Sequence, residues 1–203
     1  MTPKGFTSSE SKRVITTSYR GFVEREKMPL EVLTGLKDAN LVRVSIDWIT
    51  GKNIAEILEI ERDSFGAPWS GEDFIDLLCL DHHIGIKLSA FDKRNGPGVI
   101  PQEILGYAVY RNDDWRIELL NLAVRKDRRR IGVGRMLLEH IMAKVSPVRK
   151  RARVTCTVNE RNEVAHYFLR SLRWKAYDVH RNFYTDGTDA YSFRFMPRQN
   201  SIL

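Results

Sequence analysis

The chain has 203 residues, of which 42% are hydrophobic and 29% charged, with a formal net charge of +7, values typical of a globular protein with room for one sizeable core. No apolar run approaches the ~20 residues that span a bilayer and no signal-peptide pattern opens the chain, so we expect a cytoplasmic protein without membrane association. Cys79 and Cys156 lie in apolar segments outside any C-x-x-C or Cys/His cluster, which predicts two buried, reduced thiols and neither a disulfide nor a metal site.

Residues 1–40 are polar and show neither a helical nor a strand period. We interpret them as an N-terminal extension, which either packs on the domain through its few apolar side chains or forms a mobile tail. The domain itself is expected at 41–197, and residues 198–203 are expected to form a short C-terminal tail.

The domain opens with a predicted strand and two predicted helices. Alternating apolar residues indicate the strand at 41–46, and apolar residues at helical spacing indicate an amphipathic helix at 54–65. Ser70 and Asp73 have the types and spacing of a helix N-cap pair, so a second helix begins there. Its expected apolar face consists of Phe74, Ile75, Leu77 and Leu78.

Three strands follow, at about 83–91, 104–110 and 116–124. A connection rich in turn residues joins the first two, which favours a hairpin over a crossover. Because only a short Asn-Asp-Asp turn precedes the third strand, we expect the three strands to form an antiparallel meander.

The remaining elements alternate between helix and strand: a helix at 131–145, a strand at 153–158, a helix after Asn162, and strands at 176–179 and 190–195. The apolar face of the second of these helices is expected to include Val164, Ala165, Phe168, Leu169 and Leu172. Since a helix separates strands 116–124 and 153–158, this pair is expected to be parallel. The predicted fold is a single α/β (α+β) domain with a mixed, mostly antiparallel central sheet and helices on both faces.

A basic, glycine-containing turn links the strand at 116–124 to the next helix. It carries Gly132 and Gly134, and its arginines are Arg125, Arg128, Arg129, Arg130 and Arg135. The first amides of a helix lack intrahelical partners and lie at the positive end of the helix dipole, so they can hold a phosphate, and glycine lets the ligand approach the backbone. An ordinary strand-to-helix connection with a solvated basic face would show the same pattern.

The positive charge is concentrated in one stretch. Residues 125–153 contain eleven Lys or Arg and two acidic residues, a local balance of +9, and the rest of the chain sums to −2. Such a segment suits a polyanionic ligand, and both a small phosphorylated cofactor and a nucleic acid qualify.

Two motifs resemble the GNAT superfamily of acetyl-CoA-dependent N-acetyltransferases. N-L-A-V from Asn121, followed by R-x-x-G-x-G ending at Gly134, is similar to the superfamily's acetyl-CoA motif, and V-x-x-x-N-x-x-A-x-x-F from Val158 resembles a second family segment. I-E-x-x-S-F-x-x-P-W from Ile60 and R-N-F-Y from Arg181 look like the branch that acetylates protein N-termini, including the ribosomal-protein-alanine acetyltransferases.

The resemblance implies direct acyl transfer, in which a neutral amine attacks the thioester carbonyl of acetyl-CoA and a backbone amide holds the oxyanion. It assigns that amide to Leu122 and places the strand backbone at Leu122, Ala123 and Val124 along the pantetheine arm. Asn162 would cap its helix and touch the cofactor, although capping alone also explains it. The implied pyrophosphate cradle consists of Arg129, Arg130, Ile131, Gly132, Val133, Gly134 and Arg135.

The sequence departs from these apparent relatives at the positions of the acid and the base. They often carry Glu or His five residues before the helix asparagine and Tyr seven residues after it, where this chain has Thr157 and Leu169. Neither side chain can serve as that base or acid at neutral pH. Other members place a catalytic Glu at the spacing of Glu118, which could take the proton through a water or could equally be a strand carboxylate opposite Arg116.

These departures favour an acceptor that is easily deprotonated. An α-amine with a pKa of about 7.8 needs only about 1 kcal/mol to be neutral at pH 7, whereas a lysine amine at about 10.4 needs about 4.6 kcal/mol. We therefore expect a protein or peptide N-terminus as acceptor, with Trp69, Phe183 and Tyr184 as walls of its groove. All three could be ordinary core aromatics, Phe183 more readily than Tyr184. Tyr184 and Tyr167 are the candidate substitute acids, although Tyr167 is turned roughly 200° around the helix from the expected position.

Two other functions fit the sequence. A module that binds acetyl-CoA without turnover would explain the residues at 157 and 169, and a basic RNA- or ribosome-binding protein would explain the 125–153 segment. The second is disfavoured because that segment lacks interleaved aromatic residues apart from His140. The acetyltransferase hypothesis itself allows ribosome association through the basic segment, and the oligomeric state stays open.

Overall fold

The computed structural model describes residues 42–92, 103–145 and 153–197, so the predicted extension and C-terminal tail lie outside the described residues. Its elements are β1 (Val42–Trp48), α1 (Ile54–Ser64), α2 (Gly71–Cys79), β2 (His83–Asp92), β3 (Glu103–Asn112), β4 (Arg116–Val124), α3 (Val133–Met142), β5 (Arg153–Asn159), α4 (Glu163–Ser171), β6 (Lys175–His180) and β7 (Ala190–Phe195). Short 3-10 turns precede α1 at Gly51–Asn53 and follow β4 at Lys126–Arg128. Within these ranges, no helix has the length and apolar character needed to cross a membrane.

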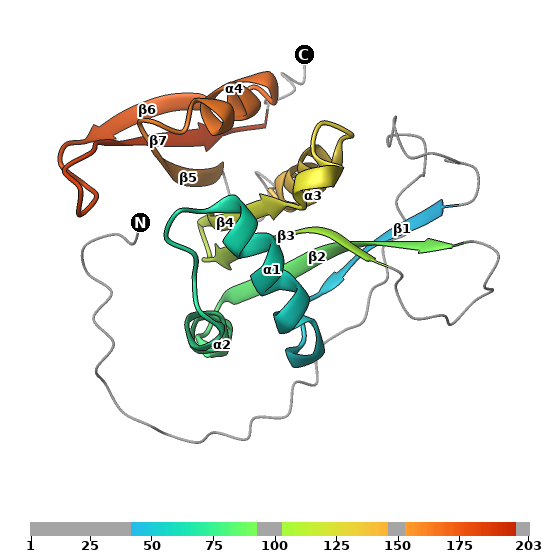
Figure 1. The fold of residues 1–203 in the computed structure, drawn as a ribbon. Helices are drawn as coiled ribbons and strands as arrows, with labels where there is room; N and C mark the ends of the chain where they lie inside the picture. Colours follow the sequence, from blue (N-terminus) through green and yellow to red (C-terminus); the bar gives the residue numbers. More distant parts are fainter. Residues whose placement is uncertain (1–41, 93–102, 146–152, 198–203) are drawn as a thin grey trace, which may run out of the picture.

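The seven strands form one sheet in the order β1-β2-β3-β4-β5-β7-β6 (Figure 1). Every pair of neighbouring strands is antiparallel except β4 and β5. The structure therefore confirms the predicted meander of β2, β3 and β4, the parallel pair, and the mixed, mostly antiparallel sheet.

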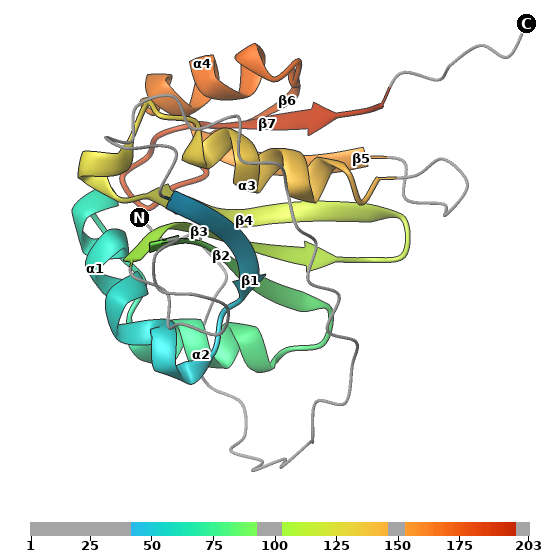
Figure 2. The ribbon, with the colours of Figure 1, turned by 90° about the vertical axis from the view of Figure 1, so that its right-hand side faces the viewer.

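Helices cover both faces of the sheet and build two separate cores (Figure 2). On one face, Ile57 of α1 and Phe74 of α2 are fully buried in a cluster with Tyr107 of β3. On the other face, Leu137 of α3 and Leu169 of α4 belong to a single larger cluster. Burying an apolar side chain of this size contributes roughly 1.5–3 kcal/mol, so both helical layers stabilise the sheet between them.

β4 and β5 separate within the sheet. They pair only from Arg116 with Arg153 to Leu119 with Cys156, although β4 continues to Val124 and β5 continues to Asn159. The register between β4 and β3 shifts at the same level and leaves Leu120 as an extra, bulged residue. A bulge bends its strand and increases its twist, which turns β4 away from β5. We call the unpaired stretch between residues 120–124 and 157–159 the β4–β5 opening.

Some of the burial predicted for helical residues was wrong. Ile75 is 53% exposed and Val164 is 75% exposed, because each lies at the margin of its apolar stripe, where the helix turns toward solvent. Cys79, expected to be buried, is exposed as the last residue of α2, whereas Cys156 is buried on β5 as predicted; both thiols are free. The helix expected at 131–145 is shorter, at Val133–Met142.

Candidate active site

The backbone of Leu122 and Val124 points into the β4–β5 opening. Arg125 N–H donates to the Leu105 carbonyl oxygen (2.9 Å), and hydrogen-bonded pairs alternate along an antiparallel ladder. Leu122 and Val124 lie an odd number of residues before Arg125, so they fall in non-hydrogen-bonded pairs with β3. Their N–H and C=O groups therefore point away from β3, toward the side on which β4 is no longer paired with β5.

The N-terminus of α3 lies beside this edge. Gly132 is the N-cap residue and has a φ of 100°, in the left-handed region that glycine tolerates best. Within the described residues no side chain caps α3, so its first amides can donate hydrogen bonds to an anion. A Cβ placed on Gly134 would lie 3.4 Å from Phe168 Cζ and 3.5 Å from Val124 Cγ2. The helix therefore begins between β4 and α4, at the β4–β5 opening.

The sequence suggested that the arginines of the basic turn together form one anion-binding rim, but in the structure they do not. Arg125 lies 3.3 Å from both Glu56 and Glu103, and Arg128 lies 3.2 Å from Glu103. These two guanidinium groups are balanced by carboxylates of α1 and β3. Their positive charge is therefore neutralised by ion pairs within the domain.

The other three arginines are exposed. Arg129 donates through Nε to the Val124 carbonyl oxygen (3.0 Å) and through Nη2 to Ser64 Oγ (2.9 Å). These bonds tie the turn to the ends of β4 and α1. Arg135 pairs with Glu139 at 3.3 Å along the surface of α3. Arg129, Arg130 and Arg135 thus remain as the charged candidates for a phosphate.

The remaining cofactor candidates contribute mainly backbone. The side chains of Ala123 and Val133 are 3% and 1% exposed in the two cores, and Ile131 packs on the larger core. Asn162 Oδ1 accepts a hydrogen bond from Ala165 N–H (3.1 Å) and caps α4. The predicted cap is confirmed, whereas a contact between Asn162 and the cofactor stays a prediction.

A buried carboxylate organises the loop between α1 and α2. Glu61 is 1% exposed, accepts the hydroxyl hydrogen of Tyr107, lies within 3.3 Å of Asn121 Nδ2, and accepts the backbone N–H of Trp69 (2.9 Å). Burial and the neighbouring Glu61 raise the pKa of the Tyr107 phenol. The sequence pattern did not point to a role for Glu61. It lies four residues after Ile57, however, which places it on the same, buried face of α1.

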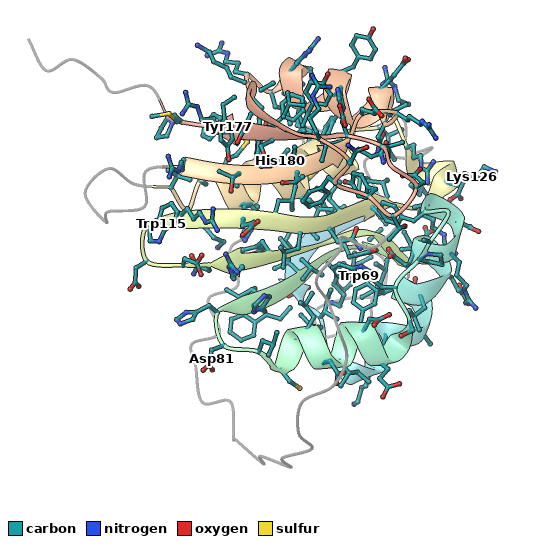
Figure 3. All side chains as sticks on the ribbon, turned by 90° about the vertical axis from the view of Figure 1, so that its left-hand side faces the viewer. Trp69, Asp81, Trp115, Lys126, Tyr177 and His180 are labelled. Atoms are coloured by element: carbon teal, nitrogen blue, oxygen red, sulfur yellow. The ribbon has the colours of Figure 1, made fainter. Side chains whose placement is uncertain are left out.

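Trp69 stands at the end of this network. Its backbone is fixed by Glu61, and its ring makes an edge contact with Phe74 at 5.2 Å between centroids. The side chain is only partly buried. In Figure 3, Trp69 lies on the same side of the molecule as His180 of β6. This position agrees with a wall of an acceptor groove.

The three aromatic candidates near the C-terminus have different surroundings. Tyr184 is 9% exposed and packs edge-on against Phe183 at 5.1 Å between centroids, whereas Phe183 is only partly buried, which reverses the expected order. Burial raises the pKa of the Tyr184 phenol, with smaller contributions from Cys156 and Asp186. Tyr167 is 69% exposed. Its position on the outer face of α4 argues against its proposed role as the acid, for the angular reason given above.

Glu118 is held by two guanidinium groups. Its Oε2 lies 2.8 Å from Arg111 Nη2 and 3.3 Å from Arg116 Nη2. The residue pairs with Thr155 of β5, before the strands separate. The contact with Arg116 agrees with the structural interpretation of Glu118, one of the two that the sequence left open.

The residue that replaces the usual base has polar neighbours that the sequence did not suggest. Thr157 Oγ1 lies 3.4 Å from Ser192 Oγ of β7, and Ser192 Oγ lies 2.8 Å from His180 Nε2 of β6. Thr157 is the first residue of β5 beyond its last pair with β4. No sequence signal joins these three residues, because they come from separate strands.

Comparisons with known proteins agree with this geometry. Residues 54–172 match the family model described as Acetyltransferase (GNAT) family. Over 142 residues, the chain is 31% identical to [ribosomal protein bS18]-alanine N-acetyltransferase from Salmonella typhimurium. The aligned region covers 69% of this chain and 86% of that protein.

Two crystal structures share the fold. The ribosomal-protein-S18-alanine N-acetyltransferase of Escherichia coli has a TM-score of 0.62 at 23% identity, covering 79% of this chain and 98% of that one. Arabidopsis thaliana NAA60 in complex with acetyl-CoA has a TM-score of 0.62 at 17% identity, covering 76% and 99%.

Proposed function

Because this chain belongs to the acetyltransferase (GNAT) family and is therefore an acetyl-CoA-dependent acyltransferase, we propose that its acceptor is the α-amine of a protein or peptide N-terminus. One observation carries the placement of the reaction: β4 leaves β5 at a bulge and exposes the backbone of Leu122 and Val124 beside the start of α3. The relatives named for N-terminal acetylation support the choice of acceptor.

Acetyl-CoA would occupy the β4–β5 opening. The backbone groups of Leu122 and the N–H of Val124 would pair with the amides of its pantetheine arm, with the neighbouring Ala123 completing the strand. The Val124 carbonyl oxygen already accepts from Arg129 Nε. The first amides of α3 and the exposed Arg129, Arg130 and Arg135 would hold its phosphates, with Asn162 on the opposite side. When bound, acetyl-CoA supplies an activated acetyl group as a thioester.

The chain's own groups would then stabilise the reaction. The Leu122 N–H would donate to the oxyanion that forms on the carbonyl oxygen. The raised pKa of Tyr184 keeps its phenol protonated at neutral pH, so it would donate a hydrogen bond to the departing thiolate. Trp69, Phe183 and Tyr184 would form the walls around the incoming peptide.

Release of the CoA thiol tests the proposal directly. We expect release with peptides that carry a free α-amine and little release with the same peptides blocked at the N-terminus but carrying an internal lysine, for the deprotonation cost given above. Equal release from both peptide series, or release only with lysine peptides or polyamines, would refute the proposed acceptor.

Ribosome association through the basic 125–153 segment is a further part of the proposal. The acceptor named for the curated relative is a ribosomal protein, which supports it, but Arg125 and Arg128 already pair within the fold. The exposed arginines would carry the interaction, so co-sedimentation with ribosomes should weaken steeply as salt is raised. Co-sedimentation that does not respond to salt, or none at low salt, would contradict it.

A further inference from the structure

Three side chains form a polar row from the β4–β5 opening into the C-terminal strands. His180 Nε2, Ser192 Oγ and Thr157 Oγ1 are separated by 2.8 and 3.4 Å. Thr157 is exposed at the opening, Ser192 is 4% exposed, and the His180 side chain is 41% exposed. The row thus runs from the reaction site through one buried hydroxyl to an imidazole in contact with water.

The proposed reaction leaves a proton to be removed at this place. An amine that attacks a thioester must lose one proton, and a positioned base commonly accelerates such a transfer. Thr157 occupies the position where similar enzymes carry Glu or His, and a hydroxyl is no base at neutral pH. A hydroxyl can, however, accept one hydrogen while donating another.

We propose that His180 is the proton acceptor for the attacking amine and receives the proton through Thr157 and Ser192. This inference rests on the proposed function. As the amine nitrogen bonds to the carbonyl carbon, it gives a proton to Thr157 Oγ1, Thr157 gives its own to Ser192 Oγ, and Ser192 gives its own to His180 Nε2. The C–S bond breaks with its electron pair on sulfur, which leaves as a thiolate. Both hydroxyls end with one hydrogen, and the imidazole becomes an imidazolium.

The neutral tautomer with hydrogen on Nδ1 leaves Nε2 free to accept, and the exposed part of the ring returns the proton to water. Histidine is the side chain whose charge normally changes between about pH 5 and 8, which is close to the pKa of an α-amine and far below that of lysine. The 3.4 Å contact between Thr157 and Ser192 is longer than an ordinary O–H···O bond. Catalytic hydrogen bonds are often long before substrate binds.

The groups around His180 define what its variants would disturb. Asp178, on the same strand, has Oδ2 3.9 Å from His180 Nε2, and the Phe183 ring lies 5.7 Å from the imidazole between centroids. Arg194 of β7 stacks over the Tyr177 ring at 5.2 Å. The ionisable groups of β4 are Arg116 and Glu118, and those of the β6–β7 connection are Arg181, Tyr184, Asp186 and Asp189. Ser192 contacts both His180 and Thr157.

The test compares kcat/KM against pH for His180→Gln, Ser192→Ala and Thr157→Val, with an N-terminal peptide as acceptor. At acidic pH, the wild-type log(kcat/KM) should rise with a slope of two, because both the α-amine and the proton acceptor of the relay must be free of a proton. Each variant should lower the rate at pH 7 by on the order of 10²-fold and reduce the slope to one. Combining two variants should cost little more than either one. The matched control is His83→Gln at the start of β2. His83 contacts Asp81, and Figure 3 shows that Asp81 lies far from His180.

Stabilisation by acetyl-CoA, measured as a melting shift, should be the same in all four variants, which separates loss of the relay from loss of the fold. The inference would be overturned if log(kcat/KM) of His180→Gln still rose with a slope of two, or if Glu118→Gln instead reduced that slope to one. Either result would leave N-terminal acetylation in place. Wild-type protein that acetylates no peptide would instead refute the proposed function.

Discussion

At the scale of single residues, Glu61 links more elements around Trp69, a wall of the proposed acceptor groove, than its own helix would suggest. One carboxylate joins α1 to Tyr107 of β3, Asn121 of β4 and the backbone of Trp69. A buried carboxylate is tolerated only when its oxygens are well supplied with donors. The position of Trp69 therefore depends on hydrogen bonds made far from it in sequence.

Removal of one donor should expose this dependence. Tyr107→Phe deletes the hydroxyl that faces Glu61 and leaves a buried charged acceptor short of a partner, so we expect the free energy of unfolding to fall by about 1–3 kcal/mol. Urea denaturation measures the change. Tyr177→Phe, at a phenol on a side chain 46% exposed, is the matched control and should cost less than about 0.5 kcal/mol. Equal midpoints for Tyr107→Phe and wild type would contradict the role given to Glu61.

Cys156 gives a pH dependence with a defined sign. Burial raises the pKa of its thiol above that of the unfolded chain. Its contribution to stability is therefore fully present below about pH 8.5, the usual thiol pKa, and is lost as the pH rises further, at up to about 1.4 kcal/mol per pH unit. Cys156→Ala should flatten this decline in chemical denaturation, whereas Cys79→Ala, at an exposed thiol, should not. Parallel pH curves for wild type and Cys156→Ala would show that the buried thiol does not titrate on unfolding.

At the scale of elements, local pattern predicted the sheet well and the site incompletely. The strand at 116–124 and the Ser70–Asp73 capping box were confirmed, because strand alternation and cap chemistry depend on neighbours in sequence. The bulge at Leu120 depends on the register with β3, and the contact between His180 and Ser192 depends on how β6 pairs with β7. Neither is encoded in a local pattern. The contact between Glu118 and Arg116, two residues apart on β4, is by contrast a local one that the sequence had already offered as one interpretation.

The start of α3 makes a testable element-scale prediction. A methyl group on Gly134 would make ordinary contacts with Phe168 and Val124, so Gly134→Ala should fold and bind acetyl-CoA. A larger side chain must extend between β4 and α4, where the proposed ligand lies. We expect Gly134→Leu to lose the increase in melting temperature that acetyl-CoA gives to wild type through ligand-linked stabilisation. A full ligand-induced shift in Gly134→Leu would place acetyl-CoA elsewhere.

At the scale of the whole molecule, the sheet is two units joined by a short parallel seam. β1 to β4 form an antiparallel block covered by α1 to α3, and β5, β7 and β6 form a second block that carries α4 (Figure 1). Only four residue pairs join β4 to β5 before the bulge. The first block contains the strand edge and helix start proposed to bind acetyl-CoA, and the second contains Thr157, Ser192 and His180. The proposed chemistry takes place where the two blocks part.

The central claim is that this site transfers acetyl groups to α-amines in preference to lysine. The most direct measurement incubates the full chain with acetyl-CoA and a peptide that carries both a free N-terminus and an internal lysine, and locates the acetyl group by fragment mass spectrometry. We predict that acetylation at neutral pH occurs almost entirely at the N-terminal α-amine. Acetylation mainly at the lysine, or no acetylation of peptides with varied N-terminal residues, would contradict this account.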